Sequence, residues 1–171
     1  MNEKSTLPKP FIFVLMPFDS SFDDIYKFGI KGAAEDVGAY AERIDEQIFI
    51  EGMLDRIFNQ ISKADFVVAD MTGRNPNVFY EVGYAHALGK IVILLTQDPK
   101  DIPFDLQHRQ HTVYGGKIDL LRTELQNKFR WALQELKNKE AEILPNDVSF
   151  FINKAQIFKG NDLSNIATVN I

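Results

Sequence analysis

The stretch DFVVADMTGRNPNVFYEVGYAHALGKIVILLT, residues 65–96, contains the pattern that decides the fold. It begins and ends with continuously apolar runs, which are typical of strands buried on both faces, and the first run closes at Asp70. Between them, Asn75 supplies an N-cap, Pro76 suits the first helical turn, and Gly89 is a typical helix end. The stretch therefore predicts a strand–helix–strand unit.

The flanking segments continue the same alternation. Ser21 and Asp24 have the spacing of a capping box and predict the start of the first helix. The alternation indicates a single α/β domain of the Rossmann or flavodoxin type, with a parallel five-stranded sheet of order 2-1-3-4-5 and helices on both faces, hence three layers. Outside the quoted stretch, strands are expected at residues 11–16, 39–43 and 111–114, and helices at residues 22–37, 52–63 and 118–139.

The domain boundaries follow from changes of composition. Residues 1–10 read as an N-terminal extension and residues 11–140 as the α/β domain. Residues 141–171 mix phenylalanine and isoleucine with polar side chains, and this tail is too apolar for simple disorder. We expect it to pack on the domain or on a partner subunit.

Composition excludes several classes of protein. The 171 residues carry a net charge of −5 without a basic block, so nucleic acid is not an expected partner. The apolar runs are too short for a membrane span, and the absence of cysteine favours the cytoplasm. The three histidines lack the spacing of metal ligands, so we expect no metal site.

Ligands of open parallel sheets bind beyond the carboxyl ends of the strands, where successive connections go to opposite faces. The loops at residues 17–24 and 70–77 flank this point. Glu81 follows on the next helix and borders its buried stripe, where the helix N-terminus favours the ionised form. A partly desolvated carboxylate suits nucleophilic attack on a sugar carbon. The alternative is that Glu81 only complements the helix dipole at a wet surface.

The same residues resemble the nucleoside 2-deoxyribosyltransferase-like superfamily. The resemblance extends over about residues 11–115, and its most specific part is the run Asn75–Glu81. The other matching motifs are Phe13–Phe18, Phe22–Tyr26, Val68–Asp70, Glu81–Ala85, Gly89–Leu94 and Asp101–Leu106.

The resemblance implies an activity. In that family the matching glutamate attacks the anomeric carbon of a nucleoside or nucleotide, releases the base, and passes the sugar to water or another base. Carried over, Glu81 is the nucleophile and Asp70 orients the ribose or the base, without any cofactor. The resemblance also implies a homo-oligomer, because family members often complete each site with a neighbour's residues. The loop after the first strand would bind the substrate through Met16, Pro17, Phe18, Asp19 and Phe22, with Phe18 as a stacking surface.

The chain also departs from the family pattern. Transferases commonly carry two further acids, for which this chain offers Asp55 and, in place of an acid, Asn75. A donor for the leaving base is therefore missing, whereas nicotinamide, already cationic in NAD, needs none. The pattern is similar, too, to nucleotide-binding domains related to the Toll/interleukin-receptor fold, some of which cleave NAD. The alternatives are thus an NAD-cleaving or nucleotide-sensing defence domain, and a non-catalytic nucleotide-binding module.

Three further sets of polar residues have two interpretations each. Thr72 and Gly73 could cradle a phosphate with Arg74 as its counter-charge, or form an exposed turn. Asn77, at the end of the same loop, is a further expected substrate-binding residue. Arg43 could reach a sugar or phosphate, or form a solvated ion pair with Asp45. The aspartates of residues 19–24 could hold a cation or a ribose hydroxyl, or cap the first helix.

Overall fold

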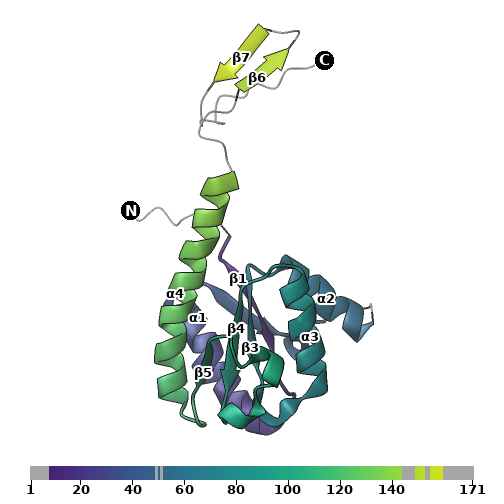
Figure 1. The fold of residues 1–171 in the computed structure, drawn as a ribbon, viewed down its shortest axis with the longest axis vertical. Helices are drawn as coiled ribbons and strands as arrows, with labels where there is room; N and C mark the ends of the chain where they lie inside the picture. Colours follow the sequence, from purple (N-terminus) through teal and green to yellow (C-terminus); the bar gives the residue numbers. More distant parts are fainter. Residues whose placement is uncertain (1–7, 49, 51, 144–148, 153–154, 160–171) are drawn as a thin grey trace. The chain divides into compact units, whose positions relative to one another are not determined.

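A computed structural model of the chain describes residues 8–48, 50, 52–143, 149–152 and 155–159 (Figure 1). The chain divides into two compact units, Met1–Leu133 and Gln134–Ile171. The first unit holds a parallel five-stranded sheet of order β2-β1-β3-β4-β5, as the sequence predicts. Its strands are β1 (Phe11–Leu15), β2 (Tyr40–Arg43), β3 (Phe66–Asp70), β4 (Val92–Thr96) and β5 (His111–Val113). The second unit contains the antiparallel pair β6 (Ser149–Ile152) and β7 (Ala155–Lys159).

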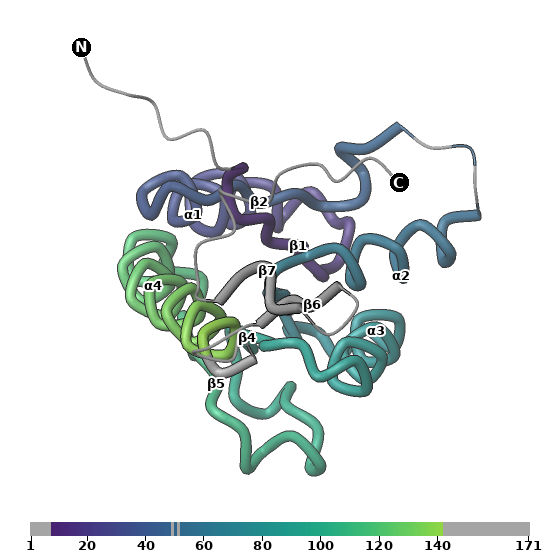
Figure 2. The backbone as a smooth tube through the Cα atoms, turned by 90° about the horizontal axis from the view of Figure 1, so that it is seen from above, coloured from purple at the N-terminus to yellow at the C-terminus, as the bar shows by residue number. Residues whose placement is uncertain are grey.

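Helices cover both faces of the sheet. Seen from above in Figure 2, α2 and α3 lie on one side of the strands, and α1 and the N-terminal part of α4 lie on the other. The predicted three-layer α/β fold is therefore confirmed. The helices are α1 (Gly32–Asp36), α2 (Met53–Lys63), α3 (Pro76–Ala87) and α4 (Ile118–Ile143).

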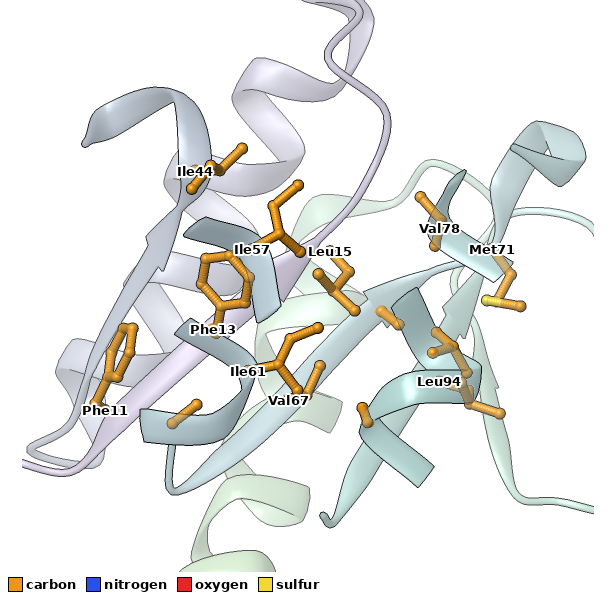
Figure 3. Close-up of a cluster of buried hydrophobic side chains, with 14 of the residues drawn as sticks. Phe11, Phe13, Leu15, Ile44, Ile57, Ile61, Val67, Met71, Val78 and Leu94 are labelled. Carbon is orange, nitrogen blue, oxygen red and sulfur yellow. The ribbon is translucent and has the colours of Figure 1, made fainter. Parts of the chain in front are cut away.

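The apolar strands predicted from the sequence form the centre of the core. Side chains of β1 that point to one face, such as Phe13, pack against Ile57 and Ile61 of α2 (Figure 3). On the other face, Phe66 of β3 meets Phe129 of α4 with ring centroids 5.4 Å apart. Burial of these side chains on both faces explains why the strands read as continuous apolar runs.

The first helical region differs from the prediction. In place of one α-helix over residues 22–37, a 3₁₀ turn at Ser20–Phe22 leads into a π-helical segment, Ile25–Lys31, followed by α1. The predicted capping box is wrong: the Ser21 amide donates to the Asp19 carboxylate at 2.9 Å, while Asp24 makes no side-chain cap bond. An aspartate two residues before an amide caps a short turn directly, so the chain turns earlier than expected.

Other predictions concern the chain as a whole. No helix of the described residues has the length and apolar character needed to span a bilayer. The predicted boundaries at residues 10 and 140, and the packing of the tail, stay predictions. Much of that tail, residues 144–148, 153–154 and 160–171, lies outside the described residues.

Candidate functional site

A cavity of about 250 Å³ lies at the carboxyl end of β1, beside the first turns of α2 and α3. This is the sheet edge that the topology predicts for a ligand. Its lining is largely apolar, and its polar side chains come from the start of α3. These polar side chains are the amides of Asn75 and Asn77, the phenol of Tyr80 and the carboxyl of Glu81.

Glu81 lies in the second turn of α3 and is only 8% exposed. The helix starts where the sequence predicts: the Asn75 side chain accepts a hydrogen bond from the Asn77 amide at 2.9 Å, and Pro76 occupies the first turn. Within the described residues, nothing donates a hydrogen bond to the Glu81 carboxylate. The Glu81 side chain lines the cavity.

The protonation of Glu81 differs from the expectation. Burial raises the pKa of the Glu81 carboxyl to about 7, because the charged form loses its hydration. The helix N-terminus was expected to favour the charged form, but its effect fades beyond the first turn. The carboxyl therefore exists in both protonation states near neutral pH.

Asp70 lies at the end of β3 and is fully buried. Its Oδ1 accepts hydrogen bonds from the Thr72 hydroxyl at 2.6 Å and the Thr72 amide at 3.0 Å, while its Oδ2 accepts one from the Tyr114 hydroxyl at 2.6 Å. Burial raises the pKa of Asp70, although these hydrogen bonds oppose the rise. Asp70 is absent from the described lining of the cavity. Its hydrogen bonds to Thr72 and Tyr114 connect the loop after β3 to the segment after β5.

The structure groups the predicted substrate-binding residues in two neighbouring places. Met16, Phe18, Asn75 and Asn77 line the cavity together with Glu81. A more open hollow of about 550 Å³ shares Asn75 with the cavity. The predicted residues that line this hollow are Pro17, Phe22, Thr72, Gly73 and Asn75.

The turn at Thr72–Arg74 does not offer a free phosphate cradle. The Gly73 amide already donates to the Asp101 carboxylate at 2.9 Å, and the Arg74 guanidinium donates to the Lys100 carbonyl. Gly73 has φ +76°, which a residue without a side chain adopts at little cost. The exposed-turn interpretation fits these contacts better, because the Asp101 carboxylate already accepts the hydrogen bond that a phosphate would need from Gly73.

Arg43, Asp19 and Asp55 do not line the cavity either. Arg43 pairs with Asp45, as in the second of its two interpretations, through two contacts of 2.6 Å, yet its side chain is only 8% exposed and therefore not solvated. Asp19 caps the 3₁₀ turn, and Asp55 is exposed on α2. Among the described residues, no group of three or more His, Asp or Glu side chains is placed to hold a metal ion.

The sequence matches one known protein family over most of its length. The profile described as nucleoside 2-deoxyribosyltransferase matches residues 31–147, which is more than half of the chain. The chain belongs to the nucleoside 2-deoxyribosyltransferase family. No curated protein sequence matches it significantly.

Two solved structures similar to this family member have low sequence identity. One is the 2-deoxyribosyltransferase of the psychrotolerant bacterium Bacillus psychrosaccharolyticus, at 16% identity and a TM-score of 0.47, covering 56% of this chain and 79% of the other. The second is the set of TIR domains in the activated Roq1 resistosome, at 10% identity and a TM-score of 0.45, covering 80% of this chain and 100% of the other.

In this deoxyribosyltransferase family member, the sequence did not indicate one wall of the cavity. Met53, Leu54 and Ile57 of α2 line it, together with Ile44 and Tyr80. The sequence predicts a helix over residues 52–63 but not what its first turns contact. Only the position of α2 beside α3 shows that these turns border the cavity.

Proposed function

We propose that the protein cleaves the N-glycosidic bond of a nucleoside with Glu81 as the nucleophile. Membership of the deoxyribosyltransferase family supports this class of chemistry. One observation carries the assignment to Glu81. Among the described residues that line the cavity, Glu81 is the one with an acidic side chain, and this side chain is buried and accepts no hydrogen bond from a described residue. A carboxylate with an unsatisfied lone pair facing an apolar cavity is an effective nucleophile.

The proposed reaction has two steps. In the first, a Glu81 oxygen forms a bond to the anomeric carbon, and the bond from that carbon to the base breaks. The electron pair leaves with the base, which takes a proton from water. In the second, water or another base attacks the same carbon, the bond to Glu81 breaks, and the carboxylate is released. The attacking molecule gives its proton to the hydroxide that the first step left. Phe18, at the cavity wall, provides a surface on which the planar base stacks.

The charges around the cavity favour a nucleoside over a nucleotide. The described lining contains no lysine or arginine. Nearby, Arg43 is paired with Asp23 and Asp45, and the Gly73 amide donates its hydrogen bond to the Asp101 carboxylate. A phosphate would therefore approach these carboxylates with no cation in the described lining to balance its charge, so we propose an uncharged substrate.

The test is a comparison of Glu81→Gln with the wild type. The protein is incubated with deoxyadenosine, deoxyinosine, dAMP and NAD, and the free base is measured by chromatography. We expect base release from the nucleosides and a loss of at least about 10³-fold in Glu81→Gln, because the amide keeps the volume but removes the nucleophile. Glu35→Gln, on an exposed position of α1, should keep full activity.

Three outcomes would contradict the proposal. Equal activity of Glu81→Gln excludes Glu81 as the nucleophile. Release of nicotinamide from NAD alone indicates an NAD-cleaving domain, and binding without release indicates a nucleotide-binding module. Circular dichroism of both variants checks that a lost activity is not a lost fold.

The proposal includes self-association and a cytoplasmic setting. The cysteine-free sequence is compatible with a reducing compartment. Large apolar side chains at the cavity remain exposed, among them Met53 and Leu54 of α2. Such side chains suit contact with a second copy of the chain.

A further inference from the structure

Arg43 is a buried cation close to the cavity that the proposed reaction does not use. We infer that Arg43 is a positioning residue: it orients the ring of Phe18 against the cavity and does not itself touch the nucleoside. The inference rests on the proposed function, because it explains how Phe18, on which the base is proposed to stack, is held in place.

The guanidinium of Arg43 is fixed by carboxylates. Its Nε and Nη2 atoms donate to the two oxygens of Asp45 at 2.6 Å each, and Nη2 also donates to Asp23 at 3.0 Å. Bidentate pairing of this kind fixes the plane of the group. Nη1 is buried and has no partner among the described residues. Because Arg43 does not line the cavity, none of its nitrogens is available to a substrate there.

Two aromatic rings lie against this fixed cation. The carbon at the centre of the guanidinium is 4.8 Å from the ring centroid of Tyr26 and 6.0 Å from that of Phe18. The Tyr26 hydroxyl donates to Glu46 at 2.6 Å and accepts from the Arg43 amide at 3.0 Å, so this ring cannot move freely. Tyr26 comes from the π-helical segment, a geometry often found at functional sites.

Phe18 is the member of this group that faces outward. Its side chain is 56% exposed, lies in the loop after β1, and lines the cavity with Glu81. An exposed ring on a loop has several rotamers, and contact of one face with a cation favours one of them. The anchored Arg43 thus presents the ring to the base before the substrate arrives.

A double-mutant cycle tests this coupling through the KM and kcat of nucleoside cleavage. We expect Phe18→Ala to raise KM about tenfold, Arg43→Met to raise it about threefold, and neither to change kcat by more than about threefold. In the double variant KM should be no higher than in Phe18→Ala. Phe18→Tyr, which keeps the ring, should raise KM less than Phe18→Ala does.

Arg122→Met is the matched control. It removes a bidentate pair with Asp36 that lies between α1 and α4, and KM should not change. If Arg43→Met raises KM by the same factor with and without Phe18, then Arg43 acts on the substrate directly and the inference is overturned. A fall in kcat alone would overturn it as well.

A second measurement needs neither turnover nor substrate. Trp131 is the single tryptophan of the chain, so F18W combined with W131F reports only on position 18. We expect R43K to increase the acrylamide quenching of this indole, since lysine cannot form the bidentate pair with Asp45. Unchanged quenching overturns the inference even if R43M fails to fold. Absence of nucleoside cleavage in the wild type would instead refute the proposed function and leave this readout intact.

Discussion

Glu81 illustrates how a single buried carboxyl can link activity and stability. Its pKa of about 7 follows from burial, and no described side chain compensates with a hydrogen bond. The carboxylate form, needed for attack, is the costly form in this cavity. The acid form is the more stable one. Activity and stability should therefore depend on pH in opposite directions.

The first prediction concerns the pH dependence of the reaction. Since only ionised Glu81 attacks, kcat/KM for a nucleoside should rise with pH and level off above pH 7, with about a tenfold loss per unit well below that value. The measurement is kcat/KM between pH 5 and 9, with Glu35→Gln as the control that keeps the profile. A constant kcat/KM over this range would contradict the assignment.

The second prediction concerns the free energy of unfolding. The folded pKa of about 7 exceeds the ordinary value of 4.5, so between these values the folded protein holds a proton that the unfolded chain has released. This stabilisation is complete below pH 4.5 and is lost as the pH rises through 7. Relative to Glu81→Gln, the wild type should lose on the order of 1–3 kcal/mol between pH 5 and 8. Urea denaturation at both pH values measures the difference, and an unchanged difference contradicts the burial argument.

At the scale of the elements, the π-helical segment and α4 must approach each other closely. Gly29 lies where the two meet, and a Cβ built there would be 2.9 Å from a methyl carbon of Leu121. The missing side chain therefore allows the close approach of these two helical segments, which lie on the same face of the sheet. Gly83 of α3, by contrast, has no atom within 4 Å of a Cβ in the same position.

These two glycines give a matched test. Gly29→Val should cost about 1–3 kcal/mol through overpacking against α4. Gly83→Val should leave stability unchanged or raise it by a few tenths of a kcal/mol, because valine has the better helix propensity. Urea denaturation of both variants compares them. Equal losses in the two variants would show that the contact with Leu121 does not decide the effect.

At the scale of the whole molecule, four exposed apolar side chains border the cavity. They come from the loop after β1, from α2 and from α3, which the sheet order brings to one edge. Apolar residues gathered in this way are uncommon on the surface of a monomer. They are Phe18, Met53, Leu54 and Tyr80, with 56%, 56%, 48% and 61% of their surface exposed.

We therefore expect a dimer or larger oligomer in solution, measured by size-exclusion chromatography with light scattering. Leu54→Glu should shift the protein toward the monomer, because a charge at the rim loses its hydration when a second copy covers it. Leu120→Glu, at an exposed position of α4, serves as the control and should keep the assembly. A monomeric wild type at micromolar concentration, or dissociation by Leu120→Glu alone, would contradict this expectation.

The sequence by itself determined the order of strands and helices, the parallel sheet and the place of Glu81 on α3, because periodicity and caps are properties of neighbouring residues. Only the tertiary structure decided the surroundings of the polar groups. Asp70 bonds to Tyr114, 44 positions away, and Arg43 pairs with Asp23, 20 positions away. Burial and pairing of this kind depend on which distant segments the fold brings together, and local spacing carries no information about them.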